Sequence, residues 1–130
     1  MKIPDKILTR KDEITNEFLY ILDKHINDIL IGKINFMYHI KDFASLLFIH
    51  PTHFSNTIKL TTGKSPCDHV EERIIEEAKK MLDDETLTIK EICHKLTYQE
   101  PTNFTKFFKA MEGITPRQYR KQKTENNTFS

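Results

Sequence analysis

The stretches 51-PTHFSNTIKLTTGKSP-66 and 101-PTNFTKFFKAMEGITP-116 decide the fold, because they are two copies of one pattern. Each copy begins with Pro-Thr and ends with a glycine, one further residue and then Ser-Pro or Thr-Pro. Proline is favoured at the first position of a helix and glycine directly after the last position. Each copy therefore predicts a helix, a stop at the glycine and the start of a further helix.

The repeat also covers the residues that precede each copy. Four apolar positions recur 49 residues later, as Ile40/Ile89, Phe43/Ile92, Ala44/Cys93 and Leu47/Leu96, whereas the positions from Pro51 onward recur 50 residues later. The one-residue change falls in the turn between two helices, where an insertion is tolerated best. Each half thus has a short helix, a tight turn and a second helix, which is the helix-turn-helix plan.

The rest of the sequence extends this plan to an all-α fold. Apolar residues recur every three or four positions from Glu13 to Ile31, which is typical of an amphipathic helix. Few glycines and prolines, three and five, also favour helices over many short strands. The sequence predicts seven helices and no strand. They are expected at 13–31, 40–47, 51–61, 66–82, 88–96, 101–111 and 116–119.

These helices give a division into two homeodomain-like helix-turn-helix subdomains joined by a linker helix. The expected segments are an N-terminal amphipathic helix (1–33) that packs on the first subdomain, the first subdomain (34–66), the linker helix (66–82), the second subdomain (83–121) and a flexible tail (122–130). The first 33 residues have no net charge and are too short for a ligand-sensing domain. The chain is therefore expected to be either a small stand-alone protein or one part of a longer chain.

Composition narrows the class of protein. The chain has 130 residues, of which 30% are charged and 38% hydrophobic, and no run of about 18 apolar residues predicts a membrane span. The N-terminus does not resemble a secretion signal, and Cys67 and Cys93 lack a spacing that suits metal binding, so a reducing cytoplasm is expected. Charge is uneven, with a net −3 over 83–100 and +4 over 101–130. The basic end suits a polyanion.

The outward faces of the second helix in each half carry the functional signal. No acidic residue occurs between 51 and 60 or between 101 and 111, in a chain with 19 acidic residues. Short polar side chains can reach base edges, and cations and hydroxyls at the margins can hold phosphates. The candidate DNA-binding residues are Thr52, His53, Ser55, Asn56 and Lys59 in the first half, and Thr102, Asn103, Thr105, Lys106 and Lys109 in the second.

Two stretches resemble the AraC/XylS family of bacterial transcription regulators. Residues 72-ERIIEEAKKML-82 are similar to the linker helix of that family, and 104-FTKFFKAMEGITPRQYR-120 is similar to its C-terminal signature. The resemblance covers about residues 34–121. It implies two helix-turn-helix subdomains that bind DNA as an activator or a repressor. By position, the base-reading residues of the family fall on Thr52, Ser55, Asn56, Thr102, Asn103 and Lys106.

This chain departs from the family pattern at a turn. The family usually has Gly-Phe where this sequence has Thr97-Tyr98. Glycine suits a positive φ, so threonine there is expected to cost on the order of 1 kcal/mol or to force another turn shape. The family also often has arginine where Asn56 and Lys106 stand, and arginine is the side chain that suits guanine best. The base preference of this chain therefore stays open.

The sequence thus predicts a sequence-specific DNA-binding transcription regulator that reads two consecutive major grooves with helices 51–61 and 101–111. Double-stranded DNA is the expected partner and RNA polymerase a further candidate. Neither a membrane, a small-molecule ligand nor a cofactor is expected, and His50 and His53 lack the further ligands that a metal site needs. A protein-interaction module that docks through the acidic segment 83–100 is the alternative. An enzyme is not expected, since no acid, base and nucleophile converge.

Overall fold

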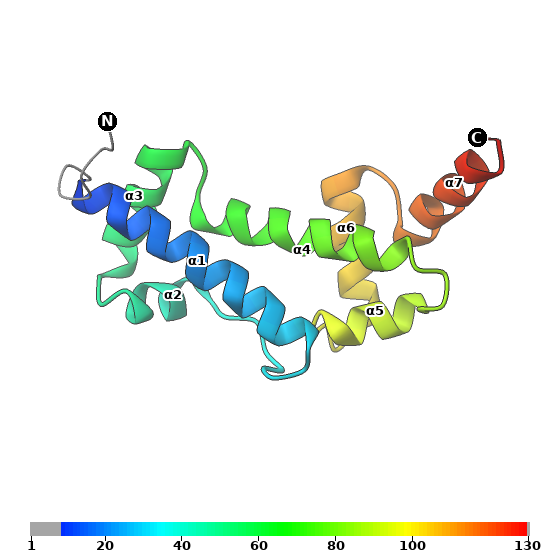
Figure 1. Cartoon of the computed structure of the whole chain (residues 1–130), viewed down its shortest axis with the longest axis horizontal. Coiled ribbons are helices and arrows are strands. Elements are labelled where there is room, and N and C mark those ends of the chain that lie inside the picture. Colours follow the sequence, from blue (N-terminus) through cyan, green and yellow to red (C-terminus); the bar gives the residue numbers. More distant parts are fainter. Residues whose placement is uncertain (1–8, 130) are drawn as a thin grey trace, which may run out of the picture.

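Helices account for nearly the whole described chain. The computed structural model describes residues 9–129, and the side chains of residues 9–125, so residues 1–8 and 130 of the predicted terminal segments lie outside it. Within that range the chain forms seven helices and no strand, which confirms the predicted fold class (Figure 1). They are α1 (Arg10–Leu30), α2 (Ile40–Leu46), α3 (Pro51–Thr62), α4 (Pro66–Leu82), α5 (Ile89–Lys95), α6 (Pro101–Glu112) and α7 (Pro116–Phe129).

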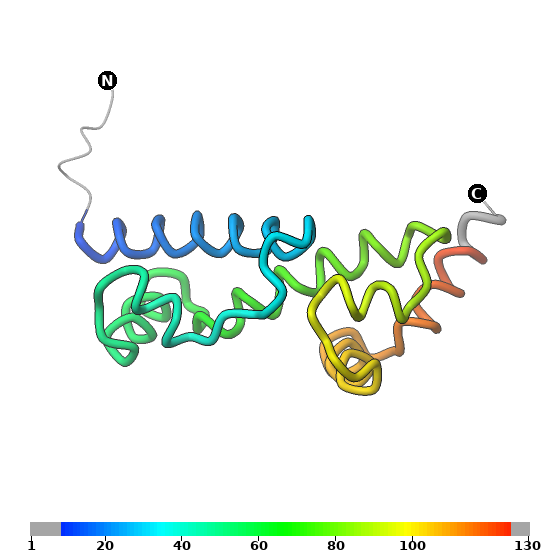
Figure 2. Tube along the Cα trace, turned by 90° about the horizontal axis from the view of Figure 1, so that it is seen from below, coloured from blue at the N-terminus to red at the C-terminus, as the bar shows by residue number. Residues whose placement is uncertain are grey.

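The linker helix α4 connects two groups of helices at opposite ends of an elongated molecule (Figure 1). Helices α1, α2 and α3 surround its first part, and α5, α6 and α7 surround its last part. Figure 2 shows α1 along one side of the molecule, with α3 and α6 on the other side. We refer to α1–α3 with the start of α4 as the first unit, and to α5–α7 with the end of α4 as the second unit.

The core of the first unit is built around one aromatic side chain of α1. Phe18 is fully buried, and its ring meets the rings of Phe43 from α2 and Phe54 from α3 edge to face, at centroid distances of 5.5 and 5.0 Å. Edge-to-face contacts of this kind stabilise beyond the area that they bury. A hydrogen bond of 2.6 Å between the hydroxyls of Thr15 and Thr61 also joins α1 to the end of α3. Helix α1 is thus an integral part of the first unit.

The core of the second unit has no helix that corresponds to α1. Phe104 and Phe108 of α6 are fully buried, with ring centroids 5.9 Å apart. Tyr98 packs on Phe104 at 5.4 Å, and Tyr119 of α7 packs on Phe108 at 5.7 Å. Phe107, which the pattern predicts to face inward, is only half-buried and stacks on Tyr98 instead. In the second unit, Tyr98, Phe107 and Tyr119 thus make the aromatic contacts that Phe18 makes in the first unit.

The ends of the helices follow the predicted signals, with two differences in length. Gly63 and Gly113 end α3 and α6 in the left-handed conformation, at φ 79° and 84°. Helix α1 begins earlier than predicted, because Thr9 and Asp12 form a capping box before Arg10.

Helix α7 is longer than the sequence analysis predicts. Its predicted end near Tyr119 is wrong, since the helix continues to Phe129. The segment that follows Tyr119 contains no glycine or proline, and Arg, Lys, Gln and Glu are good helix formers. Most of the segment predicted as a tail, 122–130, is therefore helical in the described residues.

Candidate nucleic-acid interface

Helices α3 and α6 present two similar surfaces on the same side of the molecule. In Figure 1 both helices run crosswise to α4 and in the same direction, and in Figure 2 both lie on the side opposite α1. The inward faces are buried through Phe54 and Ile58 in α3, and through Phe104 and Phe108 in α6. The 50-residue repeat thus places two equivalent helices in parallel.

The candidate residues occupy the outer faces of these two helices. Eight of them are exposed, and Ser55 and Thr105, which occupy matching positions, are half-buried. The exposed eight are Thr52, His53, Asn56, Lys59, Thr102, Asn103, Lys106 and Lys109. The acid-free character of the α6 surface extends to its end, because the Glu112 carboxylate is bound by Lys79 of α4, with Nζ–Oε1 2.8 Å. The outer faces of both helices therefore present no carboxylate to a polyanion between residues 51 and 60 and between residues 101 and 111.

The two helices begin differently. In α3, the backbone N–H of Thr52 donates to Nδ1 of His50, with a distance of 3.1 Å, so an imidazole caps the helix. In α6 the corresponding residue is Glu100, whose side chain makes no capping hydrogen bond. The sequence analysis considered His50 for metal binding and did not predict this role. The signal was its place directly before Pro51, since the residue before a first-position proline is the cap.

The turn before each helix has a residue with positive φ that is not glycine. Thr97 has φ 67°, so of the two expected alternatives the chain keeps the positive-φ turn rather than another turn shape, and Phe48 has φ 58°. The sequence analysis missed Phe48, although the 49-residue offset pairs it with Thr97. Such a conformation costs about 1–2 kcal/mol in a residue with a side chain. Phe48 is also the most exposed large apolar residue, at 94%.

A shallow hollow of about 500 Å³ adjoins α6 on the second unit. The first residues of three helices meet there, namely Ile89 of α5, Pro101 of α6 and Pro116 of α7. Lys90 and Arg117 line it, both are exposed, and neither forms an ion pair in the described part of the chain. Helix N-termini and cations both favour anions. The sequence analysis did not select these two residues, because it examined the outer face of the second helix alone.

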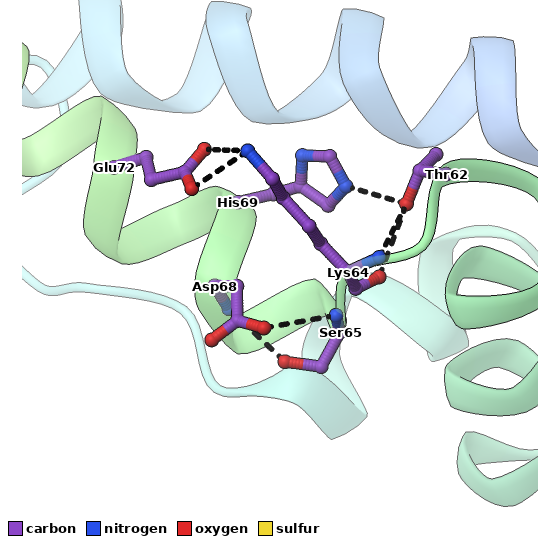
Figure 3. A network of polar contacts seen from close by, with 6 residues as sticks. All are labelled: Thr62, Lys64, Ser65, Asp68, His69 and Glu72. Atoms are coloured by element: carbon purple, nitrogen blue, oxygen red, sulfur yellow. Dashed lines mark hydrogen bonds and ion pairs between the residues drawn. The ribbon is translucent and has the colours of Figure 1, made fainter.

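A local network of polar contacts joins the end of α3, at Gly63, to the start of α4 (Figure 3). Lys64 binds the carboxylate of Glu72 at 2.9 Å, and this hydrogen bond raises the pKa of the lysine. Thr62 bonds to His69 with 2.9 Å between Oγ1 and Nε2. Lys64 follows Gly63 at the end of α3, but it is already paired, so the cations free to meet a phosphate on this unit lie elsewhere.

The other side chains that can bind metals or act as nucleophiles stand apart from one another. Residues 9–125 contain no group of three or more His, Cys, Asp or Glu side chains placed to hold a metal ion. Burial raises the pKa of the Cys93 thiol, and partial desolvation together with the nearby Glu71 and Asp68 raises that of the exposed Cys67, which favours the less reactive protonated form in both. None of the helices in the described range has the length and apolar content that crossing a bilayer requires.

Comparison with known proteins shows which family the repeated region matches. Residues 43–122, more than half of the chain, match the family described as helix-turn-helix domain. The HTH-type transcriptional regulator YobQ of Bacillus subtilis is 36% identical over 81 residues, which cover 62% of this chain and 34% of YobQ. The regulatory protein PocR of Salmonella typhimurium is 26% identical over 119 residues, which cover 92% of this chain and 37% of PocR. The chain thus spans about a third of the length of these curated relatives.

Solved structures with the same fold cover nearly the whole chain. The C-terminal domain of AraT, a response regulator from Geobacillus stearothermophilus, superimposes with a TM-score of 0.74 at 24% identity over 88% of each chain. The DNA-binding domain of AdpA, solved in complex with a target DNA, has a TM-score of 0.68 at 15% identity and covers 84% of this chain and 97% of its own. At these identities the likeness concerns the fold.

Proposed function

The chain belongs to the AraC-type helix-turn-helix family, and from this we propose that it binds double-stranded DNA sequence-specifically and regulates transcription. One observation carries the proposal. Helices α3 and α6 lie on the same side, run in the same direction and expose faces without a carboxylate (Figures 1 and 2). Two parallel helices on one side are what consecutive major grooves on one side of a duplex require.

The length of the linker supports the two-groove arrangement. Helix α4 has 17 residues, which at about 1.5 Å each gives roughly 25 Å. Helix α3 lies at the first end of α4 and α6 lies beside its last part (Figure 1), so we expect a separation of the two helices of the order of one turn of DNA, roughly 34 Å. Since the two helices differ in sequence, we expect an asymmetric site with box centres about 10–11 base pairs apart.

The residues of the two surfaces divide into two roles in this proposal. Those at the positions that read bases in the family contact base edges, and the other four hold phosphates. The base-reading set is Thr52, Ser55, Asn56, Thr102, Asn103 and Lys106, and the phosphate-binding set is His53, Lys59, Thr105 and Lys109. We also propose that the protein is not an enzyme and that it acts in the bacterial cytoplasm. RNA polymerase is a further partner in this proposal.

The experiment begins by selecting bound sequences from a random DNA pool. On the selected site, Asn56→Ala and Asn103→Ala should each lose about 1–3 kcal/mol of discrimination at a few base pairs. Lys109→Ala should weaken binding to every sequence and reduce the salt slope by roughly one ion. Asn27→Ala and Lys24→Ala, which alter exposed residues of α1, are matched controls and should change neither quantity.

Three outcomes separate this proposal from its alternatives. Equal losses on specific and random DNA would make Asn56 and Asn103 phosphate contacts. A site with two equal, palindromic boxes would contradict the reading by two different helices in one chain. Absence of any salt-dependent retention on DNA would refute the proposal and favour a protein-interaction module.

A further inference from the structure

An arginine of α7 bridges the connection between α4 and the helices α5–α7. We propose that Arg120 is a positioning residue that fixes α6 relative to α3 and thereby sets the distance between the two DNA boxes. The inference rests on the proposed function, because it concerns how the two helices are held for DNA. It does not require Arg120 to touch DNA.

The contacts of Arg120 converge on the end of the linker helix. Its Nε donates to the carbonyl of Leu82 at 2.9 Å, and its Nη2 donates to the carbonyls of Met81 at 3.4 Å and Asp84 at 3.2 Å. The last carbonyls of a helix have no partner within the helix, and they carry the negative end of its dipole. A planar guanidinium is therefore suited to this place both in charge and in geometry.

These contacts span the connection through which the second unit could move. Residues 83–88 are the only covalent link between α4 and α5, and the turn within them is held by Asp84, which accepts from the N–H and the hydroxyl of Thr86. Arg120 comes from α7, 36 to 39 residues further along the chain. It binds carbonyls on both sides of Asp83. It therefore holds the end of α4, the connecting turn and α7 together.

A second contact joins α6, the proposed DNA-reading helix of the second unit, to the linker helix α4. Lys79 of α4 pairs with Glu112, the last residue of α6, with 2.8 Å between Nζ and Oε1. Both side chains are only partly exposed, at 36% and 25%, so water screens this pair less than a fully exposed one. Arg120 and the Lys79–Glu112 pair thus hold the second unit at two separate points.

The first unit meets the linker through a different arginine, since Arg73 of α4 pairs with Asp23 of α1, with 2.8 Å between Nη2 and Oδ1. The repeat places Val70 at the position of Arg120, and Val70 is a buried residue of α4 itself. The helix that closes the first unit is therefore the linker, whereas the helix that closes the second unit is α7, a separate element. Movement between α3 and α6 is expected at the end of α4, which is where Arg120 binds.

The test measures binding to DNA in which the selected boxes are moved apart or together one base pair at a time, and to each box alone. The wild-type chain should prefer its best spacing over a one-base-pair shift by on the order of tenfold, since a misplaced box must be reached by deforming the DNA. Arg120→Met should flatten this profile to less than about threefold and leave binding to a single box unchanged. Arg120→Lys keeps the charge but loses the planar fork, so it should flatten the profile as well.

Three further variants control for charge and for folding. Lys121→Met removes an exposed cation from the same helix and should keep the spacing preference. Lys79→Glu should flatten the profile, and Glu112→Lys added to it should restore the preference by rebuilding the pair with reversed charges. The proposal is overturned if Arg120→Met weakens every spacing equally and lowers the salt slope, which would identify a phosphate contact. An unchanged profile in Arg120→Lys would also overturn it.

A measurement without DNA separates this inference from the proposed function. Leu60 and Ala110 are exposed and occupy matching positions in the repeat, so spin labels on Leu60→Cys and Ala110→Cys in a Cys67→Ser background report the distance between α3 and α6. The distance distribution should broaden in Arg120→Met and Arg120→Lys, but not in Lys121→Met. If the wild-type chain bound no DNA, the proposed function would fail while this result still decided whether Arg120 positions the second unit.

Discussion

The two units share a repeat but are supported by different means. The first unit is covered by a whole helix, since α1 places Phe18 among the rings of Phe43 and Phe54. The second unit has no such cover, and two polar contacts join it to the linker in addition to its buried side chains. A repeat therefore specifies the shape of a unit without specifying how the unit is held. Both units should depend on buried apolar area, and they differ in the polar contacts that join them to α4.

The largest expected effect comes from removing Phe18, the side chain through which α1 packs on α2 and α3. Phe18→Ala removes a fully buried ring and should lower the free energy of unfolding by about 3–5 kcal/mol. Amide hydrogen exchange should show that protection falls most in α2 and α3. Phe108→Ala is the matched variant in the second unit and should reduce protection most in α6 and α7. Equal loss of protection in both units, from either variant, would show that they unfold as one body.

A smaller effect concerns the strained turns. Thr97→Gly relieves a positive φ that a β-branched residue adopts poorly, and should raise the free energy of unfolding by about 1 kcal/mol. Phe48→Gly should gain less, because phenylalanine has no branch at Cβ. Urea denaturation of both variants measures the difference. A larger gain at Phe48 would mean that its exposed ring, rather than its backbone, carries the greater cost.

The smallest expected effect is a pH dependence confined to the first unit. His25 accepts a hydrogen bond at Nε2 from the backbone N–H of Tyr38, at 3.0 Å, and its ring stacks on Tyr38 at 3.7 Å. Burial lowers the pKa of His25 below its usual 6.5, against the opposing charges of Asp28 and Asp42. Folding thus favours the neutral ring, so this contribution is complete above pH 6.5 and is lost as pH falls through the lowered pKa.

A variant that lacks His25 checks this assignment. The free energy of unfolding should decrease between pH 7.5 and pH 5.5 in the wild-type chain, and His25→Phe should reduce that decrease. Protection of the segment around Tyr38 should follow the same trend, while that of α5 and α6 should not. A pH dependence that survives unchanged in His25→Phe would assign it to other groups.

The sequence predicted the helices better than the contacts between them. Proline, glycine and capping residues act within a few positions, so the bounds of α3, α4 and α6 follow from local signals. The outer faces of α3 and α6 follow from the apolar period in the same way. Contacts over long separations have no local signal. The bonds from Arg120 to Leu82 and from Lys79 to Glu112 depend on how α7 and α6 fold back on α4, and the sequence analysis did not predict either.

The continuity of α4 has a consequence for how the distance between boxes can change in evolution. One residue added to an α-helix advances the second unit by about 1.5 Å and rotates it by about 100°. Seven added residues restore nearly the original direction and advance it by roughly 10.5 Å, or about three base pairs. Over three base pairs, however, the major groove itself turns by about a third of a revolution. Lengthening the linker by seven residues therefore does not keep both units in the groove. The 17 residues of α4 fix both the distance between the two units and their relative rotation about the helix axis.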